Sequence, residues 1–143
     1  MTSTDRPMNS HTQTRVFSAT KEAVFAFLSD IQNLPKWATG FAKEVKRVDG
    51  KHKVVTPQGE LFFRMDSNES TGIVDMFAGP AEDQMACFPS RVIALPGGNS
   101  AYIFTSFQWP GTPDDVFAVQ NETLSEEFEV LAKQVEHSEE AAG

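Results

Sequence analysis

The sequence predicts an α+β domain in which an antiparallel sheet of about seven strands packs against a long C-terminal helix. Three observations lead to this fold class. Segments with alternating apolar residues follow one another and are separated by short turn sequences. Two short helical patterns follow the first strand, and the last third of the chain repeats apolar residues every three or four positions. The length of 143 residues supports one domain.

The first strand is expected at residues 12–18, where polar and apolar residues alternate. Thr20 is an N-cap residue for a helix that includes the apolar residues at 23–28. Asp30 is expected to cap a second short helix. That helix should end at Leu34-Pro35, because the residue before a proline disfavours the helical conformation.

Six further strands are expected, at residues 41–48, 51–56, 60–67, 72–78, 85–95 and 100–109. The breaks between them contain Gly, Pro, Asn and Asp, the residues that tight turns require. Each connection is short, and short connections join antiparallel neighbours. The strands are therefore predicted to form a meander.

A helix of about six turns is expected at residues 112–136. Pro113 occupies its first position, and Asp114 and Asp115 lie in its first turn, where a negative charge stabilises the helix dipole. Its apolar stripe contains Phe117, Leu124, Phe128, Leu131 and Val135, and its opposite face is rich in Glu. Residues 1–11 and 137–143 are predicted to be flexible tails around a domain at 12–136.

Composition and charge exclude several classes of protein. The net charge of −8 argues against general nucleic-acid binding, which needs Lys and Arg to replace counterions. Cys87 is the sole cysteine and cannot form an intramolecular disulfide. No apolar run reaches the roughly 18 residues of a membrane span, and no signal peptide is evident at the N-terminus. The expected location is therefore the cytoplasm. Neither the three histidines nor the glycines have metal- or phosphate-binding spacing, so no metal or cofactor is expected.

The order of the elements resembles the helix-grip fold, and the sequence looks like a member of the SRPBCC superfamily. The resemblance is carried by TRVFSATKEAVFAFLSDIQNLPKWATGF at residues 14–41, GIVDMF at 72–77 and RVIALPGGNSAYIFTSFQWPG at 91–111. The second and third segments, with the final helix, are similar to a bacterial polyketide-cyclase-like group. The resemblance covers residues 12–136. It implies a curved sheet that grips the C-terminal helix, with a hydrophobic cavity between them.

Such a cavity would explain why Phe outnumbers Tyr and Trp together by 12 to three. Phe offers a large apolar surface without a polar group, so the expected partner is a small hydrophobic molecule such as a lipid, a polyketide or an aromatic metabolite. The side chains expected to contact it are Trp37, Phe41, Phe63, Arg64, Met65, Asp75, Phe77, Arg91, Tyr102, Phe104, Phe107 and Phe128. Trp37 is also placed to wedge the short helices against the rim of the sheet.

Four polar residues in strand interiors are candidates for specificity or chemistry. Asp75 interrupts an apolar strand and could act as a general acid or base if it faced the cavity. It could equally face solvent, or pair with Arg64 or Arg91 across strands. An inward arginine would bind a carboxylate or enolate, whereas an outward one would pair with surface acids. Tyr102 faces either the pocket or the helix, and its hydroxyl needs a partner if buried.

These residues leave two alternatives to simple ligand binding. The first is an enzyme resembling polyketide cyclases and aromatases, with Asp75, Arg91 and Tyr102 as the candidate catalytic residues. The second is a protein-interaction module that resembles the chaperone co-activator branch of the same fold and uses the Glu-rich helix face. Both faces of the strand at 100–109 are largely apolar. Either the helix edge or the partner subunit of a homodimer would cover that excess.

Overall fold

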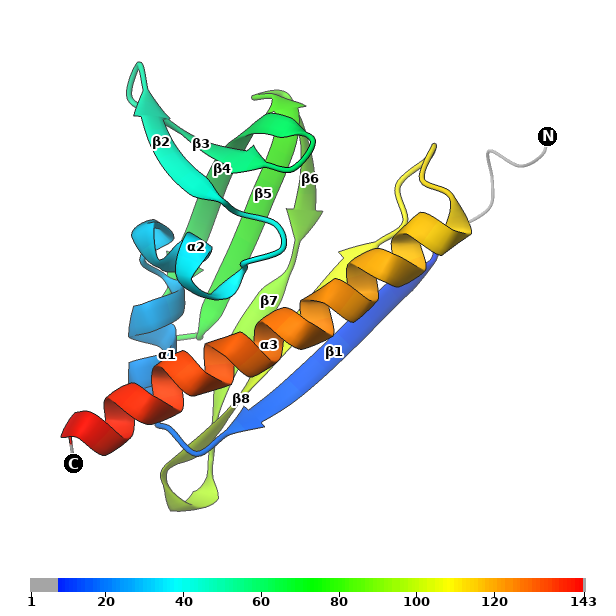
Figure 1. The fold of residues 1–143 in the computed structure, drawn as a ribbon. Helices are drawn as coiled ribbons and strands as arrows, with labels where there is room; N and C mark the ends of the chain where they lie inside the picture. The colour runs from blue at the N-terminus through cyan, green and yellow to red at the C-terminus, as the bar shows by residue number, and fades with distance from the viewer. Residues whose placement is uncertain (1–7, 143) are drawn as a thin grey trace.

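The computed structural model describes residues 8–142 of the chain, and the side chains of residues 8–136 (Figure 1). The elements are β1 (Ser10–Phe17), α1 (Lys21–Leu28), η2 (Ile31–Asn33), α2 (Leu34–Trp37), β2 (Glu44–Val48), β3 (Lys51–Thr56), β4 (Gly59–Asn68), β5 (Ile73–Ala81), β6 (Gln84–Phe88), β7 (Ser90–Leu95), η3 (Pro96–Gly98), β8 (Asn99–Phe107) and α3 (Asp114–Ala142). Among these residues, no helix is both long and apolar enough to cross a bilayer.

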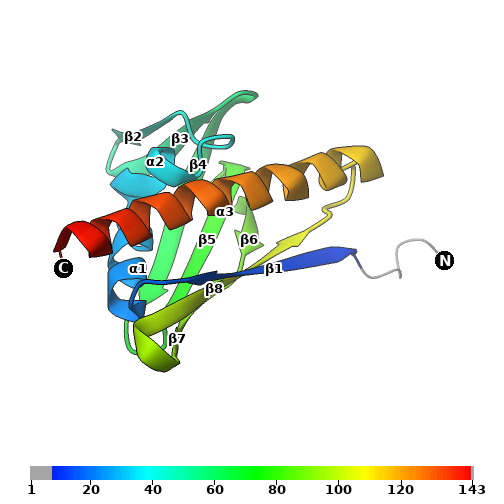
Figure 2. The same cartoon turned by 60° about the horizontal axis from the view of Figure 1, so that its bottom comes forward.

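The strands form one antiparallel sheet in the order β1-β8-β7-β5-β4-β3-β2, and β6 also pairs with β5. The sheet is curved, and α1, α2 and α3 lie on the same face of it (Figures 1 and 2). We call this the helix-covered face and the opposite one the outer face. The long helix α3 runs across the helix-covered face (Figure 2). The predicted fold class, an antiparallel sheet with two short helices after the first strand and a long C-terminal helix, is confirmed.

Pro89 divides the segment at 85–95, which was expected to be one strand, into β6 and β7. Proline has no backbone N–H and cannot continue a ladder of hydrogen bonds. The two pieces then have different main partners: β6 pairs with β5, whereas β7 pairs along its length with β8. The sheet therefore has eight strands where about seven were expected.

The structure confirms the two N-caps that the sequence predicts, at Thr20 and Asp30. Thr20 Oγ1 accepts a hydrogen bond from Ala23 N at 3.1 Å, and Asp30 Oδ1 accepts one from Gln32 N at 3.0 Å. The helix that Asp30 caps, η2, ends at Asn33, directly before Leu34-Pro35 as expected. A further helical turn that was not expected, α2, follows at once and continues to Trp37. Pro35 lies in its first turn, where a missing N–H costs no helical hydrogen bond.

The ends of the domain differ in detail from the expected tails. Of the tail expected at 1–11, residues 1–7 lie outside the described part, and β1 begins at Ser10. At the other end, α3 continues to Ala142, and Gly143 lies outside the described residues.

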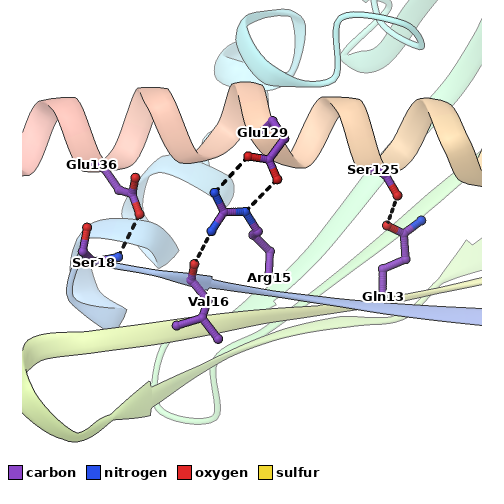
Figure 3. A network of polar contacts seen from close by, with 7 residues as sticks. All are labelled: Gln13, Arg15, Val16, Ser18, Ser125, Glu129 and Glu136. Carbon is purple, nitrogen blue, oxygen red and sulfur yellow. Dashed lines mark hydrogen bonds and ion pairs between the residues drawn. The ribbon is translucent and has the colours of Figure 1, made fainter.

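A row of polar contacts, the polar seam, ties the edge strand β1 to α3 (Figure 3). Arg15 forms a bidentate pair with Glu129, with N···O distances of 2.9 and 3.0 Å. On one side of this pair Ser125 Oγ donates to Gln13 Oε1 at 2.6 Å, and on the other Ser18 N donates to Glu136 Oε2 at 2.9 Å. The apolar stripe of α3 is thereby held over the sheet, with Leu131 and Val135 buried.

Candidate functional site

Alternation along the strands decides which predicted site residues face the helices. Successive side chains of a strand point to opposite faces of the sheet. In β5, Val74 and Met76 belong to the buried core, so Asp75 and Phe77 lie on the outer face. In β4, Phe63 and Met65 pack with the core, so Arg64 lies on the outer face.

The structure brings together seven of the twelve residues expected to contact a ligand. Those on the helix-covered side of the sheet are Trp37, Phe41, Phe63, Met65, Tyr102, Phe104 and Phe128. Those on the outer face are Arg64, Asp75, Phe77, Arg91 and Phe107. The strand residues of both sets come from strands with apolar residues on both faces, and for that reason periodicity alone did not separate them.

An aromatic cluster occupies the space between β8 and α3. The Tyr102 ring lies 5.4 Å from that of Phe128 and 6.3 Å from that of Trp37, as measured between centroids. Phe104 also contacts Phe128, at 6.2 Å, and stacks on Phe88 at 6.0 Å. Trp37, Tyr102 and Phe128 each expose 2% or less of their surface. The centre of the expected cavity is thus filled by the protein's own rings.

The Tyr102 hydroxyl takes part in a chain of buried hydrogen bonds within the protein. It donates to Ser90 Oγ at 2.9 Å, and Ser90 Oγ in turn donates to the carbonyl oxygen of Val74. Asp75 Oδ1 accepts a bond from Ser90 N at 3.2 Å on the outer side of the strand. Burial raises the pKa of Tyr102 well above its usual range, so the residue is a neutral phenol. These contacts join β5, β7 and β8, and they use the proton of the hydroxyl for a hydrogen bond within the protein.

The two arginine candidates have local partners on the outer face. The guanidinium of Arg64 lies 4.1 Å from the centre of the Phe77 ring and 3.4 Å from Asp66. Arg91 Nε donates to the carbonyl oxygen of Thr71 at 3.0 Å. The three candidate catalytic residues are therefore not gathered at one point, since Asp75 and Arg91 lie on one face of the sheet and Tyr102 on the other. The enzyme alternative stays a prediction.

An open cleft of about 440 Å³ is lined by residues of η2, β3, β4 and β6 and of the turn between β5 and β6. Its apolar lining includes Ile31, Phe63, Met65 and Met85. Its polar lining includes Lys51 and His52 at the start of β3, the predicted site residue Arg64 on β4, and Glu82 in the turn between β5 and β6. Lys51 Nζ and Glu82 form an ion pair at 2.7 Å across it. Phe63 connects the cleft to the interior, because its ring lies 6.5 Å from that of Phe41.

The sequence did not single out Glu127, the one charged side chain among the buried residues of the described chain. It projects from α3, is 5% exposed, and accepts hydrogen bonds from Gly40 N and Phe41 N, both at 3.0 Å. Burial raises the pKa of its carboxyl to about 7, and the two backbone donors partly oppose that rise. Its position between Leu124 and Phe128 on the apolar stripe could have indicated that it is buried. Because Glu126 and Glu129 lie beside it in a Glu-rich stretch of the helix, the sequence alone did not distinguish it from these exposed residues.

Metal binding finds no support in the described residues, where no group of three His, Cys, Asp or Glu side chains is arranged to hold an ion. Cys87 is half-buried, and burial raises the pKa of its thiol, which disfavours the nucleophilic thiolate.

Comparison with known proteins identifies the fold. The sequence matches no family model, and no curated protein is similar to it in sequence. Solved structures do match: the START superfamily protein from Mycobacterium smegmatis has a TM-score of 0.64 at 14% identity, over 92% of this chain and 99% of that one. The Zhui aromatase/cyclase from Streptomyces sp. R1128 has a TM-score of 0.66 at 13% identity, over 94% of each chain. The chain has the fold of the SRPBCC superfamily.

A third solved structure extends the range of proteins that share the SRPBCC fold. The Aha1 dimer from Colwellia psychrerythraea matches with a TM-score of 0.69 at 16% identity, over 90% of this chain and 97% of that one. The predicted resemblance to the SRPBCC superfamily is thus confirmed at the level of the fold. Proteins as different as an aromatase/cyclase and Aha1 share it, so activity has to be argued from the site.

Proposed function

We propose that the protein binds a small, mainly apolar molecule in the cleft beside Phe63. The observation that carries this proposal is the continuity between the cleft and the core: Phe63 lines the cleft and also contacts Phe41 inside. The volume of about 440 Å³ lies within the roughly 300–1,000 Å³ typical of small-molecule sites. Ile31, Phe63 and Met65 would cover the apolar body of the ligand.

The polar lining favours a ligand with one polar end. Lys51, His52 and Glu82 come from the start of β3 and from the turn between β5 and β6, whereas the apolar residues lie on η2, β4 and β6. Arg64 on β4 adds one further charged group to the lining. A molecule that lay along the cleft would bury its apolar part and leave its polar part at these polar side chains. A lipid, a polyketide or an aromatic metabolite has this character. Because the interior is filled by rings, the cleft and not the centre of the fold is the proposed site.

The test uses N-phenyl-1-naphthylamine, a neutral apolar dye whose fluorescence rises when it leaves water. We expect saturable binding to the full chain, competed by fatty acids or aromatic polyketides if these are ligands. Ile31→Glu places a charge in the apolar lining and should weaken binding at least about tenfold, since burying an unpaired charge is costly. Val119→Glu is the matched control, because Val119 is 58% exposed on α3 and does not line the cleft.

Two results would oppose the proposal. One is the absence of saturable dye binding to the unaltered protein. The other is equal weakening by Ile31→Glu and Val119→Glu, which would show that the dye binds elsewhere. Thermal unfolding of both variants verifies that each is folded before the affinities are compared.

A further inference from the structure

Glu127 connects α3 to the segment at residues 39–41, between α2 and β2. One carboxylate oxygen, Oε2, accepts the N–H groups of both Gly40 and Phe41. Phe41 N also donates to Ala38 O, at 3.0 Å. For Gly40 N, Glu127 is the partner that the structure shows. Both bonds lower the pKa of the carboxyl, because N–H donors favour its charged form, but burial raises that pKa by more.

The close approach between the segment and α3 depends on glycine at position 40. A Cβ atom there would lie 2.5 Å from Thr123 Cγ2 and 3.3 Å from Glu127 Oε2. The first distance is shorter than two carbon atoms tolerate, so a larger residue would have to displace the Thr123 side chain or the segment itself. The contact is thus built by three positions, namely Gly40, Thr123 and Glu127.

The charges around Glu127 do not neutralise it. Glu126, its neighbour on α3, raises the pKa of Glu127, and Lys43 on the facing segment lowers it. Lys43 Nζ itself donates to Thr39 O at 2.8 Å, and no salt bridge to Glu127 occurs among the described side chains. An ionised carboxyl that is buried without a cation is unfavourable, whereas the protonated form can be buried at much lower cost.

We propose that Glu127 is a proton-operated clamp: it holds residues 39–41 against α3 when its carboxyl is protonated and releases them when the proton is lost. Released into water, the carboxyl regains its ordinary pKa of 4.5, whereas in the clamp its pKa is about 7. The closed form therefore binds the proton more tightly, and acid favours closing. From these two values the closing equilibrium falls about 70-fold between pH 5 and pH 8.

The clamp would regulate the proposed ligand site through Phe41. Release of residues 39–41 frees the Phe41 ring, which in the closed form contacts Phe63 in the lining of the cleft. Rising pH should then open a path from the cleft toward the aromatic cluster. This consequence rests on the proposed function, whereas the clamp itself does not.

The test is amide hydrogen exchange by NMR on the full chain between pH 5 and pH 8, corrected for the intrinsic effect of pH on exchange. The Gly40 amide reports the clamp directly. We expect its protection to fall by tens of fold over this range relative to the Ala42 amide, which bonds to Ala38 O and not to Glu127. Glu127→Gln keeps an accepting oxygen but cannot titrate, so its Gly40 protection should not change with pH. Glu126→Gln, at the exposed neighbouring position, should retain the dependence on pH.

Constant Gly40 protection in the unaltered protein would overturn the clamp, and so would an equal dependence on pH in Glu127→Gln. Gly40→Ala provides a second variant. At pH 5 its amide at position 40 should be protected from hydrogen exchange only as much as the Gly40 amide of the unaltered protein is at pH 8. Dye binding is measured separately, with the neutral dye at each pH. If the dye does not bind at any pH, the proposed function fails, while hydrogen exchange still decides whether the clamp exists.

Discussion

The hydroxyl of Tyr102 donates a hydrogen bond to Ser90 Oγ at 2.9 Å, and Ser90 is the only link between that hydroxyl and β5 that the described residues show. Ser90 is donor and acceptor at once, since its hydroxyl also donates a hydrogen bond to the carbonyl oxygen of Val74. Both side chains are buried. The two partners are consequently not equivalent, because the loss of each leaves a different group without a partner.

Ser90→Ala should destabilise the protein more than Tyr102→Phe does. The first change leaves the buried Tyr102 hydroxyl without an acceptor, which costs about 1–3 kcal/mol. The second removes a donor whose absence Ser90 tolerates, at about 1 kcal/mol. Urea unfolding of both variants measures the two losses. A Tyr102→Phe variant that lost more stability than Ser90→Ala would contradict the direction of donation.

Much of this arrangement could be predicted from the sequence, and the remainder has physical reasons. Alternation and turn residues located β3 at residues 51–56 and identified the capping roles of Thr20 and Asp30. Proline chemistry located the end of η2 before Leu34-Pro35 but missed the helical turn α2 that follows, and it was overlooked at Pro89, where it divides a strand. Local rules describe what a residue can do, and pairing with distant strands decides which possibility is realised.

The faces of the sheet were harder to predict. Alternation states that Val74 and Asp75 point in opposite directions, but β5 and β8 carry apolar residues on both faces. Only the position of α3 distinguishes inside from outside, and that position depends on contacts between residues more than 100 apart, such as Arg15 and Glu129. The same distance concealed the role of Glu127, whose partners lie 86 and 87 positions away.

The stability of the protein should fall as pH rises from 5 to 8, because of Glu127. In the folded protein its carboxyl has a pKa of about 7, against 4.5 in ordinary surroundings. The folded state therefore holds this proton more tightly than the unfolded state does, and the stabilisation is lost as pH rises through 7. The loss between pH 5 and pH 8 is about 2.5 kcal/mol. Urea unfolding at several pH values checks this, and Glu127→Gln should show a smaller change.

Phe128→Ala and Phe107→Ala should differ strongly in their effects on stability. Phe128 is 2% exposed and contacts Trp37, Tyr102 and Phe104, so truncation should cost about 3–5 kcal/mol. Phe107 is half-buried on the outer face and contacts Trp109 at 6.3 Å. Its truncation should cost about 1–2 kcal/mol. Thermal or urea unfolding compares them, and similar losses would mean that the outer face is covered by something further.

The Arg15–Glu129 pair should contribute little to stability, in spite of its bidentate geometry. The two side chains are 31% and 62% exposed, so water and salt screen their attraction. A double-mutant cycle with Arg15→Met and Glu129→Gln should give a coupling of about 0.5–1 kcal/mol at low salt, and less in 1 M NaCl. A coupling that salt does not change would show that the pair is held out of reach of solvent.

The pairing of β1 with β8 also imposes an order on folding. Ser10 lies opposite Phe107, so the first strand to leave a ribosome finds its partner only after nearly all of the other strands have been made. Until then β1 has no sheet to join, and the meander β2 to β5, whose contacts are local, can assemble without it. Such long-range closure slows folding. The polar seam requires α3, which follows β8 in the chain, so the contacts of β1 with the helix form after those with the sheet.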